Sequence, residues 1–126
     1  MTDLIAKPAA PIRDLDQLRE RLRTFVAERD WDQFHSPKNL AMALIAEAAE
    51  LVEHFQWLTE GESAALPDAK RAEVADELAD VLVYLVRLAD KLDIDLLAAV
   101  TAKMARNEAK YPAELVKGSA RKYNEY

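Results

Sequence analysis

The scarcity of glycine is the feature that most restricts the fold of this chain. Only two glycines occur among its 126 residues. β-Hairpins and barrels need many positions with positive φ, which glycine adopts most readily. Cysteine is absent, which excludes a disulfide framework, a cysteine-based zinc site and a thiol nucleophile. A turn-rich β architecture is therefore not expected.

Apolar side chains instead recur at helical spacing in four segments separated by capping residues and proline. Ser36 followed by Pro37 is a strong helix start, because the hydroxyl caps a helix whose first position suits proline. We expect that helix to stop at Gly61, the next to open at Pro67, and the last to end before Pro112. The expected helices cover residues 14–29, 36–60, 68–92 and 93–111. Four helices with short connections predict an all-α four-helix bundle.

Composition and charge limit the partners and the cellular location that are expected for this chain. We expect a flexible N-terminal arm at residues 1–12, one helical domain at 13–112 and a polar tail at 113–126. The net charge of −6 is not that of a typical nucleic-acid partner, which carries a basic face. No apolar run reaches the ~18 to 20 residues of a membrane span, and the N-terminus does not resemble a signal peptide. Neither a nucleic-acid nor a membrane partner is expected, and the cytoplasm is the expected location.

A carboxylate stands on the apolar face of the second expected helix. Projected at 100° per residue, Glu47 falls in the same sector as Leu40 and Leu44, which form the stripe expected to be buried. Glu50 lies at the edge of this sector, whereas Glu53 points the opposite way. Because removing a lone charge from water is costly, Glu47 needs an explanation.

The third expected helix carries a second acidic pair, Glu77 and Asp80, again three residues apart. No lysine or arginine stands three or four residues from any of these four carboxylates, so no helix neighbour neutralises them. Two carboxylate pairs offer the oxygen ligands that Mg²⁺ prefers. The alternative interpretation is that three of them are solvated, and that Glu47 reaches solvent or a distant base.

Glu47-x-x-Glu50 followed after 26 residues by Glu77-x-x-Asp80 resembles the metal motif of the MazG-like all-α NTP pyrophosphatase superfamily. Further segments are similar to its dCTP pyrophosphatase branch: residues 29–35, Asn39-Leu40, Phe55-Gln56-Trp57, residues 80–85, Lys103-Met104, Lys110-Tyr111-Pro112 and residues 118–123. Two positions depart from the branch pattern, as this chain aligns with it: Leu22 stands where a base-contacting histidine can occur, and His54 where an apolar residue is common. Both departures concern the base preference rather than the phosphate chemistry.

The resemblance implies hydrolysis of dCTP to dCMP and diphosphate in nucleotide-pool house-cleaning, with Mg²⁺ on Glu47, Glu50, Glu77 and Asp80. It also implies a homotetramer whose sites borrow groups from neighbouring chains. We expect Glu47 or Glu50 to act as general base toward water. The residues expected to bind substrate are Trp31, Asp32, Gln33, Phe34, His35, Trp57, Tyr84, Lys103, Asn107 and Lys110.

Several of these residues have an ordinary structural interpretation as well. The aromatic side chains could stack on a base, but aromatics more often pack in a core. His35 could bond a base or sugar, or help to cap the helix at Ser36. Lys103, Asn107 and Lys110 share one helical ridge that suits phosphate oxygens, or that is simply solvated.

Three other functions are compatible with parts of this sequence. A di-iron carboxylate bundle requires Glu-x-x-His on two helices, whereas Asp32 precedes His35 and Leu51 precedes His54. A non-enzymatic interaction module would account for amphipathic helices but not for carboxylates without a basic neighbour. A pyrophosphatase of broader (d)NTP specificity would keep the same phosphate chemistry.

Overall fold

The computed structural model describes residues 10–120, and these residues form helices and connecting turns without strands. The elements are α1 (Leu15–Glu28), the 3-10 turn η1 (Asp32–Phe34), α2 (Pro37–Glu53), α3 (Glu60–Ser63), α4 (Asp68–Lys91), α5 (Leu96–Lys110) and α6 (Ala113–Val116). The all-helical class predicted from the sequence is confirmed. Most of the expected N-terminal arm and the last six residues of the expected tail lie outside the described residues. None of the helices between residues 10 and 120 is both long and apolar enough to cross a membrane.

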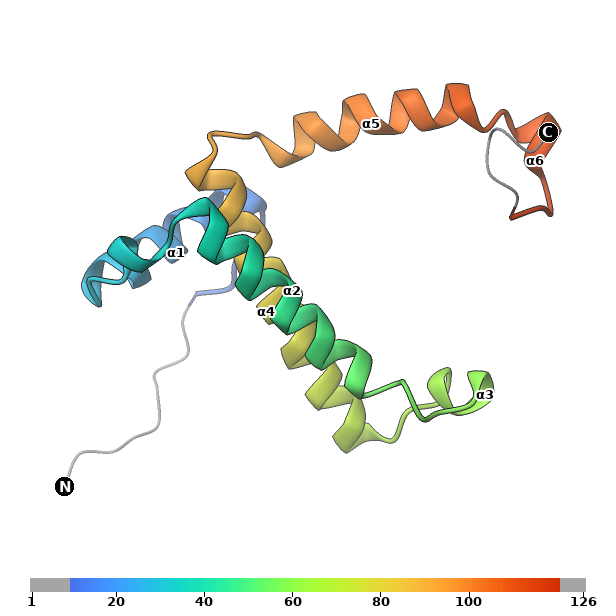
Figure 1. The fold of residues 1–126 in the computed structure, drawn as a ribbon, viewed down its shortest axis with the longest axis horizontal. Coiled ribbons are helices and arrows are strands. Elements are labelled where there is room, and N and C mark those ends of the chain that lie inside the picture. The colour runs from blue at the N-terminus through green and yellow to red at the C-terminus, as the bar shows by residue number, and fades with distance from the viewer. Residues whose placement is uncertain (1–9, 121–126) are drawn as a thin grey trace.

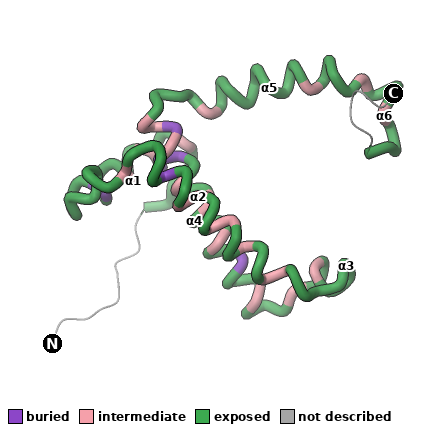
Figure 2. Tube along the Cα trace, viewed as in Figure 1, coloured by how far each residue is buried: buried purple, intermediate pink, exposed green. Residues whose placement is uncertain are grey.

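The pairing of α2 with α4 is the main packing contact between helices of the described chain. Helix α1 makes a smaller contact with α4, near the C-terminal end of α4. Figure 2 shows that most of the buried residues gather where these three helices meet. The buried apolar side chains are Leu18, Val26, Leu40, Val74, Val86 and Ala89. Helix α5 leads away from the α2–α4 pair (Figure 1) and packs extensively on no other helix of the described chain. In the described residues, one chain therefore forms a hairpin of α2 and α4 to which the long helices α1 and α5 are attached, and these four helices do not close into a bundle within one chain.

Side chains cap the starts of three of the four long helices, including the predicted cap at Ser36. The Asp14 carboxylate accepts a hydrogen bond from the Gln17 amide at 2.8 Å, and the Ser36 hydroxyl accepts one from the Asn39 amide at 3.2 Å. Asp95 caps α5 in the same way. Each cap satisfies an amide that the first turn of a helix leaves without a partner.

Two aspartates take over the role that glycine usually has at helix ends. Asp30 follows α1 with φ 53° and Asp93 follows α4 with φ 54°. After α1, the amide of Trp31 bonds the carbonyl of Val26 and the amide of Asp30 bonds that of Ala27, which is a Schellman motif. The corresponding bonds follow α4. Aspartate tolerates this left-handed backbone better than most residues, so a chain poor in glycine can still turn sharply.

The expected end of the second helix at residue 60 is wrong. Helix α2 ends at Glu53, and Gly61 lies inside the short helix α3 rather than after a helix. Thr59 and Glu62 form a capping box, in which each side chain accepts a hydrogen bond from the other residue's amide. This box needs Thr59 in an extended conformation, so the preceding helix has to end first. Consequently Trp57 lies in a turn and not near the end of a helix.

Leu40 is the side chain most completely removed from water, with 1% of its surface exposed. Replacing Leu40 with alanine should lower the free energy of unfolding by about 2 to 5 kcal/mol, because the substitution removes buried methyl groups and leaves a cavity. Denaturant unfolding followed by circular dichroism measures this loss. The control is Lys38→Ala in the same helix, where the side chain is exposed. A loss no larger than that of the control would contradict the assignment of the core.

Candidate metal centre and nucleotide site

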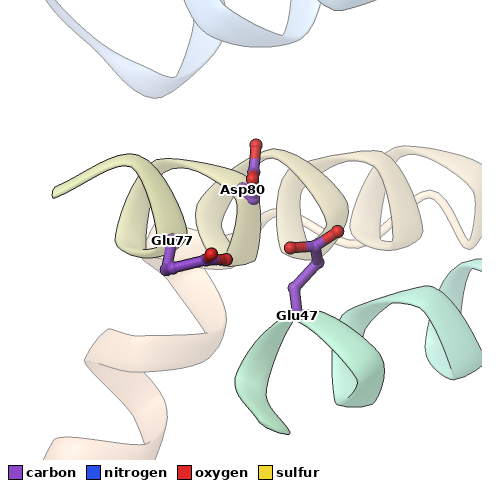
Figure 3. Close-up of side chains that lie close together, drawn as sticks. All are labelled: Glu47, Glu77 and Asp80. Carbon is purple, nitrogen blue, oxygen red and sulfur yellow. The ribbon is translucent and has the colours of Figure 1, made fainter. Parts of the chain in front are cut away.

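Three carboxylates from two helices come together in the α2–α4 pair. One ligand oxygen each of Glu47, Glu77 and Asp80 lies within 4.8 Å of the other two. Figure 3 shows Glu47 reaching from α2 toward α4, with the Glu77 carboxylate turned toward it. The sequence placed these groups in two separate i,i+3 pairs, and the helix pairing brings Glu47 of the first pair close to both members of the second. Glu50 is not part of the group of three, although its carboxyl is close enough to affect Glu47.

The charges of this acidic cluster, Glu47, Glu77 and Asp80, are poorly compensated. One oxygen of Glu47 and one of Glu77 are buried and accept no hydrogen bond. Within residues 10–120, no lysine or arginine forms an ion pair with any of the three. A nitrogen of His54 lies 3.7 Å from the other Glu77 oxygen, but a histidine compensates charge only when it is protonated. Buried oxygens without partners fit the needs of a hard divalent cation.

The environment of Glu47 changes its protonation. Burial raises the pKa of Glu47 to about 7, and the neighbouring carboxyls of Glu50, Asp80 and Glu77 add to this effect. Burial disfavours the charged form, and like charges oppose it further. At neutral pH Glu47 therefore exchanges a proton readily. The sequence predicted that Glu47 lies on the apolar face of its helix, and the burial that results from this position raises its pKa.

The residues between α1 and α2 present two aromatic side chains at the surface. Trp31 is 44% exposed and Phe34 is 60% exposed. The Trp31 ring packs edge-on against Phe25, with 5.6 Å between ring centroids. Gln33 stabilises the turn by donating to the backbone carbonyl of Asp30 at 3.0 Å. Neither ring is buried in the core of the single chain, so both are accessible to a ligand or to another chain.

Sequence reasoning missed a buried arginine behind this aromatic segment. Arg87 on α4 is only 3% exposed. Its Nε donates to His35 Nδ1 at 3.3 Å, and its Nη2 donates to Asp32 at 3.2 Å. Lys91 also contacts Asp32 at 2.6 Å, and the pKa of Asp32 is lowered mainly by this lysine. No local pattern signals these contacts, because the partners lie 52 and 55 residues from Arg87 in the sequence.

The structure does not bring the remaining predicted substrate residues together within one chain. Trp57 is 86% exposed in the turn after α2. Tyr84 is half-buried on α4, one turn beyond Asp80. Lys103, Asn107 and Lys110 do share a ridge of α5, but α5 leads away from the acidic cluster (Figure 1). The basic ridge cannot reach the cluster of its own chain in this arrangement.

Comparisons with known proteins place this chain among relatives of known family. The family model of the MazG-like family matches residues 42–126. Human dCTP pyrophosphatase 1 is 47% identical over 118 residues, which cover 92% of this chain and 69% of the human protein. The mouse protein of the same name is 46% identical with the same coverage. A solved structure of a pyrophosphatase from Archaeoglobus fulgidus has a TM-score of 0.75 and 40% identity, covering 84% of this chain and 99% of that chain.

The raised pKa of Glu47 predicts an unusual pH dependence of stability without metal. Between about pH 4.5 and pH 7 the folded chain keeps a proton on Glu47 that the unfolded chain has already lost. The free energy of unfolding should therefore fall as the pH rises through this window. Glu47→Gln should weaken this dependence and make the protein more stable than the wild type at pH 8. Thermal unfolding in EDTA at pH 5, 6, 7 and 8 measures both effects.

The matched control for this prediction is Glu53→Gln on the same helix, where the side chain is exposed. It should follow the wild-type pH dependence. Equal pH dependence in the wild type and Glu47→Gln would show that Glu47 titrates normally.

Proposed function

The chain belongs to the MazG-like family, and from this membership we propose that it is a Mg²⁺-dependent hydrolase that converts dCTP and water to dCMP and diphosphate. The observation that carries the proposal is 47% identity over 92% of the chain to a protein named dCTP pyrophosphatase 1. The acidic cluster supports it independently, because a triphosphate needs a cation to approach carboxylates. The biological role we propose is removal of unwanted nucleotides from the precursor pool.

Glu47, Glu77 and Asp80 would hold the metal, and Glu50, one turn from Glu47, would complete the set. Bound Mg²⁺ supplies Lewis-acid stabilisation of the charge that develops on the phosphate oxygens. The three clustered carboxylates come from two paired helices rather than from loops, so their separation is fixed before any ligand binds. This preorganisation lowers the cost of assembling the site.

A carboxyl of this chain would take the proton from the attacking water. Glu47 is the first candidate, because a pKa near 7 lets it accept and release a proton at neutral pH. Glu50 is the second candidate, because its side chain is exposed and close to Glu47. Direct attack by water needs no serine or lysine nucleophile, and the chain contains no cysteine.

The exposed rings between α1 and α2 would bind the base. Trp31 and Phe34 offer flat apolar surfaces on which a base can stack, worth about 1 to 3 kcal/mol per base. Asp32, Gln33 and His35 add polar groups to the same segment. Trp57 and Tyr84 would join this pocket from the turn after α2 and from α4.

We propose that the protein assembles as a homotetramer. Large apolar side chains remain exposed on three helices of the single chain: Met42, Ile45 and Val52 on α2; Leu78, Leu82 and Leu85 on α4; Leu97, Val100 and Met104 on α5. Apolar patches of this extent typically mark interfaces between proteins. In such an assembly, α5 of a neighbouring copy would supply Lys103, Asn107 and Lys110 to the phosphates.

The proposed setting follows from charge and substrate. An acidic chain with a net charge of −6 is not expected to bind nucleic acid, so the free nucleotide is the partner that we propose. The cytoplasm, where nucleoside triphosphates are available, is the proposed location.

The proposed reaction is tested by incubating the protein with each common dNTP and NTP, with Mg²⁺ or with EDTA, and identifying the products. We expect dCMP and diphosphate from dCTP with Mg²⁺ alone, and no turnover by the Asp80→Asn variant at unchanged helicity. Equal rates on all nucleotides would support a broader (d)NTP pyrophosphatase. Release of single phosphate, or no turnover of any nucleotide, would contradict the proposal.

The proposed assembly predicts that a charge on the apolar ridge of α5 dissociates the oligomer. Met104→Glu should convert the tetramer to smaller species, because it places a carboxylate in an apolar contact. Sedimentation velocity measures the change in mass. Ala102→Glu introduces the same charge two residues earlier on the same helix, facing away from Met104, and should leave the mass unchanged. A monomeric wild type would refute the assembly.

A further inference from the structure

The buried Arg87 stands behind the aromatic segment and contacts three groups. Its Nε donates to His35 Nδ1 at 3.3 Å and its Nη2 to Asp32 at 3.2 Å. Its Nη1 lies 3.5 Å from Asp90 on the same helix. A guanidinium carries five donors in a fixed fork and is always charged. Arg87 can therefore bond these three partners at once, each through a different nitrogen.

The contact with His35 fixes the state of that ring. Arginine has no acceptor, so His35 Nδ1 has to accept the hydrogen bond and cannot itself carry a proton. A neutral ring with a bare Nδ1 carries its proton on Nε2. Burial and the adjacent Arg87 charge lower the pKa of His35, which also favours the neutral ring. His35 is thereby held as a donor through Nε2.

Among the three partners of Arg87, His35 is the one without a second cationic partner in the described part of the chain. Asp32 keeps Lys91 at 2.6 Å, and Asp90 keeps Arg23 of α1, whose Nε donates at 2.8 Å. In the described part of the chain, Arg87 is the hydrogen-bond donor to His35 Nδ1. Loss of the guanidinium would therefore leave both carboxylates paired and release only the histidine.

We propose that Arg87 is a positioning residue that holds His35 neutral with its proton on Nε2, so that His35 recognises a hydrogen-bond acceptor of the nucleoside. The recognition step rests on the proposed function, whereas the state of the ring does not. The partners of Arg87 are His35, Asp32 and Asp90, and none of them belongs to the acidic cluster. Its effect is on substrate binding and not on the hydrolytic step.

Nuclear magnetic resonance of the two imidazole rings tests the ring state without substrate. The chain contains two histidines, so a His35→Gln variant assigns the signals. We expect an unprotonated Nδ1 and a protonated Nε2 on His35 in the wild type. Arg87→Met should raise the titration midpoint of His35, because it removes the adjacent positive charge that opposes protonation of the ring. The groups that face His35 are Arg87, Asp32 and Lys91.

The control is Lys91→Met, which removes a nearby cation but no bond to His35, and its midpoint should move much less. A proton on Nδ1 in the wild type would overturn the proposal even if Arg87→Met did not fold. An unchanged midpoint in a folded Arg87→Met would overturn it as well.

Steady-state kinetics with dCTP then tests recognition. Arg87→Met should raise KM about 10-fold, as expected for one lost hydrogen bond, with kcat within about twofold of the wild type. Lys91→Met should change KM less than twofold. A loss of kcat at constant KM would overturn the positioning role. Absence of dCTP turnover in the wild type would refute the proposed function and leave the ring-state result standing.

Discussion

The packing of α2 against α4 is the contact on which the rest of the molecule depends. It buries Leu40 and Val74, and it brings Glu47 within 4.8 Å of the carboxylates of α4. The apolar contact and the acidic cluster thus lie on the same faces of the same two helices. The hydrophobic effect drives the pairing, and the repulsion between the carboxylates opposes it.

This opposition connects stability to function. Oxygens of Glu47 and Glu77 that are buried without a partner lower the stability of the empty protein. A ligand that binds only the folded form returns that free energy when it binds. Active sites commonly concentrate such unfavourable groups, because the property that destabilises the fold also prepares the chemistry. The apolar packing of α2 against α4 stabilises the fold and offsets this loss of stability.

At the end of the α2–α4 pair away from the acidic cluster, charged side chains form ion pairs with one another. Arg23, Asp90, Arg87 and Asp32 form a continuous series of contacts from α1 through α4 to the turn before α2. Its last contact anchors Asp32, which lies in the segment that carries the exposed rings of Trp31 and Phe34. Beyond it, α5 leaves the hairpin with its apolar face uncovered (Figure 2). Within the single chain, ion pairs therefore connect α1, α4 and the turn before α2, whereas the apolar side chains of α5 stay exposed.

The sequence by itself determined the helix starts, the two acidic pairs and the absence of basic neighbours, because capping and i,i+3 contacts act within one turn of chain. It did not determine that α2 ends at Glu53, although Thr59 and Glu62 carried a capping-box signal. Only the tertiary structure decided that Arg87 reaches His35, and that α5 leads away from the hairpin. Contacts of this kind join residues far apart in the sequence. They depend on how whole helices pack, which no local pattern encodes.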